Sequence, residues 1–251
     1  MAELVIVGSG TGIPSLRRAS PCLLLLSKTL RILIDTGPGS LRRLLEVGVT
    51  YQDIDLLLYT HLHPDHTADL VPILFACKYG ESPRVKDLTL FGGPGLKTFF
   101  EKLEELYHPW ISPQTYRLKI KEASSQPFSI GGMKILSAPM AHLPGSLGYR
   151  FEWDDGKALV ISGDTDYCES LIRLASKADL LVLECSFPDE KKVNGHLTPS
   201  LAGRIARESG SRRLLLTHLY PICDQHDILT PCRREFPGEV FLAEDLQRFT
   251  L

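Results

Sequence analysis

The sequence predicts an α/β fold in which two β-sheets pack face to face and helices cover their outer faces. Three observations support this prediction. Short apolar segments typical of strands recur along the chain, helical segments lie between several of them, and both halves share this order. With 251 residues, 43% of them hydrophobic, the chain can bury a substantial core. Since no low-complexity linker separates the halves, one domain spanning residues 1–251 is expected.

The first half reads as strands that are separated by Gly and Pro turns, with helices between them. The predicted strands lie at residues 4–7, 22–26, 31–34, 56–59 and 88–91. The predicted helices lie at residues 41–47, 69–78 and 95–107, and the last is clearly amphipathic. Pro72 is expected in the first turn of the middle helix, where proline is tolerated.

The second half repeats this order. The predicted strands lie at residues 116–120, 133–137, 147–153, 158–162, 180–184, 213–217 and 239–242. Helices are predicted at residues 169–176 and 200–209. Thr198 and Pro199 are typical of a helix N-cap and of the residue that follows it, and they precede the second of these helices.

A dense group of potential metal ligands follows the strand at residues 56–59. His61, His63, Asp65 and His66 place three imidazoles and one carboxylate within six residues. Such nitrogen and oxygen donors suit Zn²⁺ and similar ions. In a loop that leaves a strand end, residues 61 and 63 can point toward one position while residues 65 and 66 turn toward a second. The segment therefore predicts two adjacent half-sites for metal.

Two coordination spheres need more ligands than this segment offers, and three candidates stand at later strand ends. His142 follows the strand at 133–137 and a short turn, Asp164 follows the strand at 158–162, and His218 follows the strand at 213–217. Each alone reads equally well as an ordinary turn residue, but together they repeat one pattern. A carboxylate between two metals can bridge them through its two oxygens, which is the role predicted for Asp164.

The run His61-Leu62-His63-Pro64-Asp65-His66 resembles the HxHxDH signature of the metallo-β-lactamase fold superfamily, and the resemblance spans nearly the whole chain. It implies a four-layer αββα sandwich of two mixed β-sheets flanked by helices. The implied metal site is a list of seven side chains: His61, His63 and His142 on one metal, Asp65, His66 and His218 on the other, and Asp164 between them.

Within the superfamily, the chain is most similar to the ribonuclease Z-like phosphodiesterase branch. A glutamate and a histidine near the metals assist proton transfer there, and Glu184 with His196 resembles that pair. The segment from His142 to Tyr149 matches the H-x5-GY pattern of the branch. Read without the family, Glu184 is a strand-end carboxylate and His196 a residue near a helix start. Asp35 is expected to support a ligand histidine rather than to bind metal.

The chain also departs from the tRNA-processing members of that branch. Those members insert a long arm that grips tRNA, but here His142 and Asp164 are only 22 positions apart. The early PxKxRN motif is degraded at residues 14–19, and the Arg-Tyr pair after the last histidine is replaced at residues 219–223. Processing of tRNA 3′ ends is therefore not expected.

The resemblance implies a dinuclear-metal hydrolase that uses a metal-activated hydroxide on a phosphodiester small molecule or a short RNA. Asp65, Glu184 and His196 are the candidate catalytic residues. Two divalent ions are implied, with Zn²⁺ expected and Mn²⁺ or Fe²⁺ as alternatives. Two other functions stay open: a thioester hydrolase of the glyoxalase II kind, and a metal-binding protein without catalysis. Ser9, Ser162 and Ser186 have no surroundings that suggest a serine nucleophile.

Composition narrows the remaining expectations. Lys plus Arg number 28 and Asp plus Glu 30, so a net charge of −2 provides no general attraction for nucleic acid, and the basic pair Arg17-Arg18 reads as solvated surface. Six scattered cysteines without a CxxC pair, and no export signal or membrane span, favour free thiols in the cytoplasm and no membrane partner. Relatives often dimerise, which makes an apolar patch around residues 69–78 a candidate interface.

Overall fold

The computed structural model describes residues 2–124 and 126–251, and it contains two seven-stranded sheets. The first sheet contains β1 (Glu3–Gly8), β2 (Cys22–Leu26), β3 (Arg31–Ile34), β4 (Leu56–Leu58), β5 (Leu88–Gly92), β6 (Leu118–Glu122) and β14 (Arg248–Thr250). The second contains β7 (Phe128–Ile130), β8 (Met133–Pro139), β9 (Leu147–Trp153), β10 (Ala158–Ile161), β11 (Leu180–Glu184), β12 (Arg213–Thr217) and β13 (Glu239–Leu242). Each sheet mixes parallel and antiparallel pairs.

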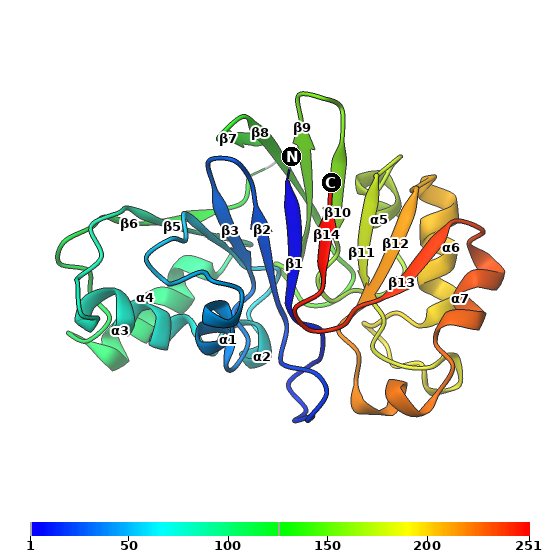
Figure 1. Ribbon diagram of the computed structural model, residues 1–251, viewed down its shortest axis with the longest axis horizontal. Coiled ribbons are helices and arrows are strands. Elements are labelled where there is room, and N and C mark those ends of the chain that lie inside the picture. Colours follow the sequence, from blue (N-terminus) through cyan, green and yellow to red (C-terminus); the bar gives the residue numbers. More distant parts are fainter. Residues whose placement is uncertain (1, 125) are drawn as a thin grey trace.

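Helices lie on the outer face of each sheet, which confirms the predicted four layers (Figure 1). The helices beside the first sheet are α1 (Ser40–Glu46), α2 (Pro64–Thr67), α3 (Leu70–Tyr79) and α4 (Leu96–Tyr107). Those beside the second are α5 (Glu169–Leu174), α6 (Pro199–Ser209) and α7 (Leu229–Glu235), with short 3₁₀ turns at η1 (Asp189–Lys191) and η2 (Pro221–Gln225). None of the helices in residues 2–124 and 126–251 is long and apolar enough to cross a membrane.

Alternating side chains along each strand build the layers. Leu4 and Ile6 of β1 pack between the two sheets, whereas Val5 and Val7 pack under the helices. The strand β10 alternates in the same way against α5 and α6. Strands that are buried on both faces read as continuous apolar runs, and this explains why these segments carry so few polar residues.

The chain closes on itself at its two ends. The strand β14 pairs antiparallel with β1, so the C-terminal segment joins the sheet that the first half builds (Figure 1). This pairing was not predicted, and neither were the short elements β7, α2 and α7. Their sequences, RFT in β14, FSI in β7, PDHT in α2 and LTPCRRE in α7, lack the apolar runs that mark the predicted strands and the apolar spacing that marks the predicted helices. The strand predicted at residues 116–120 lies at Leu118–Glu122, a shift of two residues.

Two local expectations are corrected by side-chain contacts. Arg18 is buried rather than solvated, because its guanidinium group bonds Ser9, Asp224 and a main-chain carbonyl. Thr198 occupies the predicted N-cap position of α6, but its side chain makes no capping bond. The Asp189 carboxylate accepts the Ser200 N–H at 3.1 Å instead. All six cysteines are unpaired, as predicted, and the cytoplasmic location stays a prediction.

Candidate metal centre

The predicted ligands lie close together because the strands that precede them end at the same edge of the two sheets. The strands β3 and β4 are parallel, as are β10, β11 and β12, while β8 and β10 are both antiparallel to β9. The carboxyl ends of parallel neighbours lie at the same edge of a sheet, where loops carry binding groups. The side chains that emerge from these ends are Asp35 after β3, His61 after β4, His142 after β8, Asp164 after β10 and His218 after β12.

One group of potential ligands joins His61, His63, His142 and Asp164. The His63 Nδ1 atom lies 2.9 Å from His61 Nε2 and 3.3 Å from His142 Nε2. Asp164 Oδ2 lies 3.7 Å from His61 Nε2 and 3.9 Å from His142 Nε2. Four donors around a zinc ion at about 2.0–2.1 Å each lie about 3.3 Å apart. The observed spacing therefore fits one cation.

A second group joins Asp65, His66 and His218, and it meets the other oxygen of Asp164. The Nε2 atoms of His66 and His218 are 3.2 Å apart. Asp164 Oδ1 lies 3.5 Å from His66 Nε2 and 3.4 Å from His218 Nε2. Asp65 Oδ2 lies 3.8 and 3.7 Å from the same two nitrogens. All seven predicted ligands are thus brought together, while their role as ligands stays a prediction.

Asp164 is the side chain that the two groups share. It is 3% exposed, and its Oδ1 atom has no hydrogen-bond partner among the described residues. A buried carboxylate oxygen without a donor is costly unless a positive charge faces it. Nitrogen and oxygen donors without a thiolate suit divalent ions such as Zn²⁺, and a cation between the groups would face this oxygen. The donor set therefore fits metal.

Outer contacts hold four of the five imidazoles with Nε2 turned inward. The outer Nδ1 atoms of His66, His142 and His218 contact Asp35 Oδ2 at 2.7 Å, the Gly195 carbonyl at 2.9 Å and Ser186 Oγ at 3.0 Å. The His61 Nδ1 atom contacts Thr60 Oγ1 at 3.1 Å. Such partners are typical of metal-ligating histidines, because they fix the tautomer and the orientation of the ring.

Asp35 supports both groups, in the supporting position predicted for it. Its Oδ2 atom contacts His66 and also accepts the Thr60 hydroxyl at 2.7 Å. Because the Thr60 proton points to Asp35, Thr60 Oγ1 accepts from His61 Nδ1 and leaves His61 Nε2 with its lone pair. Asp35 and His218 both have positive φ angles, 59° and 54°. Such backbone conformations cost energy in residues other than glycine and gather at functional sites.

Electrostatics keeps the Asp164 carboxylate charged and favours a cation beside it. Burial raises the pKa of Asp164, but the imidazoles of His218 and His66 outweigh burial and hold this pKa well below its usual range. Burial lowers the pKa of His61 to about 2, helped by His66, so this ring is neutral at neutral pH. Burial would also lower the pKa of His66, but Asp164 and Asp35 raise it well above the usual value. The pocket thus attracts positive charge.

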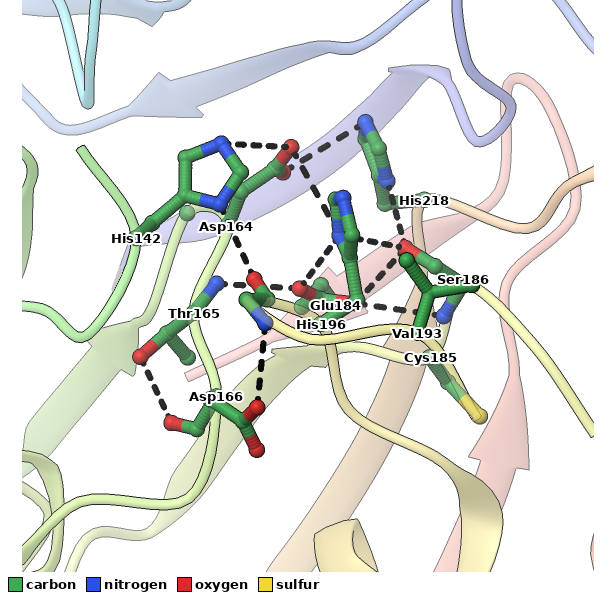
Figure 2. A network of polar contacts seen from close by, with 12 residues as sticks. His142, Asp164, Thr165, Asp166, Glu184, Cys185, Ser186, Val193, His196 and His218 are labelled. Carbon is green, nitrogen blue, oxygen red and sulfur yellow. Dashed lines mark hydrogen bonds and ion pairs between the residues drawn. The ribbon is translucent and has the colours of Figure 1, made fainter. Parts of the chain in front are cut away.

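Glu184 and His196, the predicted proton-transfer pair, lie beside these groups (Figure 2). His196 Nδ1 is 2.9 Å from Glu184 Oε1 and 4.0 Å from Asp164 Oδ2. Burial lowers the pKa of His196, but the hydrogen bond that its Nδ1–H donates to the Glu184 carboxylate outweighs burial and raises this pKa above its ordinary value. The side chain of His196 is 13% exposed, whereas that of Glu184 is buried. His196 therefore keeps its proton more readily than a free imidazole does, and its ring is partly accessible.

Sequence reasoning missed Thr60, Ser186 and Gly195, which orient the histidines. A serine or threonine next to a motif carries no pattern of its own, and the role of Gly195 lies in its carbonyl. Gly195 has a φ of 85°, and an added Cβ would lie 3.1 Å from His142 Nδ1. Glycine fits this position because it has no Cβ and tolerates positive φ, and the close approach to His142 is visible only in the folded chain.

Residues 30–219, more than half of the chain, match the family described as the beta-lactamase superfamily domain. The chain therefore belongs to the beta-lactamase superfamily. This family assignment confirms the resemblance that the HxHxDH run indicated.

Individual relatives agree with the assignment. The chain is 27% identical to the "Ribonuclease Z" of Myxococcus xanthus (strain DK1622) in an alignment of 304 positions. This alignment covers 98% of this chain and 96% of the relative. It is 29% identical to the "Ribonuclease Z" of Mycobacterium bovis (strain BCG / Pasteur 1173P2) in an alignment of 276 positions, which covers 99% of this chain and 98% of the relative. The crystal structure of the metallo-beta-lactamase fold protein YhfI from Bacillus subtilis superposes on this chain with a TM-score of 0.85 at 28% identity. The superposition covers 99% of this chain and 98% of that protein.

Replacing Asp35 with Asn tests its support of both groups. Asparagine tolerates positive φ, so the backbone is expected to persist. Its one amide oxygen cannot replace both carboxylate oxygens, because Oδ1 accepts the Thr60 N–H while Oδ2 accepts from the Thr60 hydroxyl and from His66. Zinc affinity is therefore expected to fall about 10- to 100-fold. Competition with a chromogenic chelator measures this affinity. Asp87→Asn, which alters a partly exposed carboxylate paired with Arg117, is the control. Equal zinc affinities for Asp35→Asn and the control would contradict the assignment.

Proposed function

We propose that this chain is a single-domain, metal-dependent hydrolase with a dinuclear centre that cleaves phosphodiester bonds. The observation that carries the proposal is the pair of ligand groups that share Asp164, with His196 and Glu184 alongside. The names of the Myxococcus and Mycobacterium relatives point to the same chemistry, because a ribonuclease cleaves phosphodiesters. Zinc is the expected metal, since imidazole and carboxylate donors suit it.

The proposed ligand set assigns a role to each side chain. When bound, the two cations supply a water of lowered pKa and stabilise negative charge on the phosphate oxygens. Asp65 accepts the Gly12 N–H at 3.0 Å, which holds its carboxylate toward His66 and His218 and leaves it able to orient a nearby water. His196 donates a proton to the departing oxygen, and Glu184 holds its ring in place.

The charges around the site favour a small phosphodiester or a short RNA over a folded tRNA. Arg17 and Arg18 both pair with Asp224, and Lys192 pairs with Asp166. Basic side chains that are already paired contribute little to binding a long phosphate backbone. The Myxococcus alignment runs over 304 positions against 251 residues here, so at least 53 positions of that relative have no counterpart. Between His142 and Asp164 the structure places β9 and β10 alone, which leaves no room for a tRNA-gripping arm.

We also propose a homodimer, formed through the groove between α3 and α4. Val71, Phe99 and Leu103 line this groove, and Phe75 and Tyr79 lie exposed on α3. Exposed apolar surface of this kind marks interfaces between chains. Sedimentation velocity tests the proposal: the wild type is expected to sediment as a dimer and Phe75→Glu as a monomer, whereas a monomeric wild type would contradict it.

Metal removal tests the proposed chemistry directly. The wild type is expected to hydrolyse bis(p-nitrophenyl) phosphate, to lose activity after chelation and to regain it with Zn²⁺, Mn²⁺ or Fe²⁺. Rates on a glyoxalase-type thioester, measured in parallel, distinguish a phosphodiesterase from a thioester hydrolase. Faster turnover of the thioester would overturn the phosphodiesterase proposal, and no turnover of any substrate by fully loaded protein would favour a metal-binding protein without catalysis.

Replacing His196 with Ala tests the proton donor. The variant is expected to keep its zinc content and to lose about 10²- to 10⁴-fold in turnover of 2′,3′-cyclic AMP, whose leaving alkoxide needs a proton. The loss on bis(p-nitrophenyl) phosphate is expected to be much smaller, because p-nitrophenolate leaves without one. His226→Ala, at a histidine that pairs with Glu190, is the control. Equal losses of turnover on both substrates would show that His196 is not the proton donor.

A further inference from the structure

One buried hydroxyl group connects the two functional parts of the site. The strand β11 ends at Glu184, and Ser186 follows two residues later with no exposed surface. Figure 2 shows its side chain between His196 and His218, beside the carboxylate of Glu184. The two histidines lie parallel, with ring centroids 6.1 Å apart and an interplanar angle of 10°. A single side chain therefore reaches a proposed metal ligand and the proposed proton donor together.

The contacts of this hydroxyl define its hydrogen bonds. Ser186 Oγ lies 2.6 Å from Glu184 Oε2, 3.0 Å from His218 Nδ1 and 3.2 Å from His196 Nδ1. A hydroxyl has one proton to donate and two lone pairs that accept. Because the carboxylate of Glu184 accepts, the proton of Ser186 goes to Glu184 Oε2. Both imidazole Nδ1 atoms must then carry hydrogens that point toward Ser186.

This arrangement determines what each imidazole can do. With its hydrogen on Nδ1, the neutral ring of His218 keeps its lone pair on Nε2, the atom that faces Asp65, His66 and Asp164. His196 shares its Nδ1 hydrogen between Ser186 Oγ and Glu184 Oε1, which lies 2.9 Å away. The Nε2 atom of His196 is then the one that can pass a proton to substrate. Both outcomes depend on the same hydroxyl.

We propose that Ser186 is a positioning residue that orients His218 for metal binding and His196 for proton donation. The proposal rests on the proposed function for its second part, whereas its first part concerns metal affinity alone. Among the described residues, Ser186 Oγ is the one hydrogen-bond partner of His218 Nδ1. Without Ser186 Oγ, the His218 Nδ1 hydrogen would be buried without its acceptor, and the ring could turn.

Two measurements on Ser186→Ala test the proposal. Zinc affinity, from competition with a chromogenic chelator, is expected to fall about 10- to 100-fold, as for other groups that orient a ligand histidine. At saturating zinc, turnover of 2′,3′-cyclic AMP is expected to fall about tenfold more than turnover of bis(p-nitrophenyl) phosphate, in line with a misplaced general acid. Ser186→Thr, which keeps the hydroxyl, is expected to restore both quantities toward the wild type.

Ser209→Ala is the matched control, because Ser209 is also a buried serine but its hydroxyl bonds the Ala206 carbonyl and Ser211 at the end of α6, away from the ligand groups. Wild-type zinc affinity and wild-type substrate preference in Ser186→Ala would overturn the proposal. An equal loss on both substrates with unchanged zinc affinity would overturn it as well. If the wild type cleaves neither phosphodiester, the proposed function fails, and the ratio of zinc affinities alone decides the role of Ser186.

Discussion

The site depends on one buried carboxylate whose two oxygens face different groups of imidazoles. Asp164 Oδ2 faces His61 and His142, and Oδ1 faces His66 and His218. Burying a charged group is costly unless opposite charge compensates it, and Oδ1 has no hydrogen-bond donor among the described residues. A pair of cations would supply that compensation from both sides. The shared carboxylate therefore couples the two groups, so that displacing Asp164 would disturb both.

The fold supplies this carboxylate and its neighbours from six strand ends. Apolar residues on both faces of the strands fix the two sheets against each other and against their helices, so the loops at one edge start from rigid positions. The loops bear the strain instead. Asp35 and His218 adopt positive φ angles, and Gly163, with a φ of 62°, approaches Thr60 so closely that an added Cβ would lie 2.5 Å from Thr60 Cβ. This close approach brings together the residues that directly precede Asp164 and His61.

The sequence predicted the layers and the seven side chains that the structure brings together, because both predictions depend on repeated or dense patterns. Short apolar runs that end at Gly and Pro turns mark most of the strands. Four potential ligands within six residues are hard to explain as an ordinary turn. The residues that orient those ligands could not be predicted. Ser186 is an ordinary serine until the turn after β11 brings it between two histidines, and Gly195 acts through a carbonyl that every residue has. The pairing of β14 with β1 depends on contacts between residues more than 240 positions apart, as between Glu3 and Thr250, which no local pattern encodes.

The central claim is that Asp164 lies between two metal ions. Anomalous diffraction at the zinc absorption edge, from crystals of the zinc-loaded protein, tests it most directly. Two peaks about 3.5–4 Å apart are expected, one beside His61 and His142 and one beside His66 and His218, with the Asp164 carboxylate between them. A single peak on one side of Asp164, or zinc bound away from this carboxylate, would contradict it.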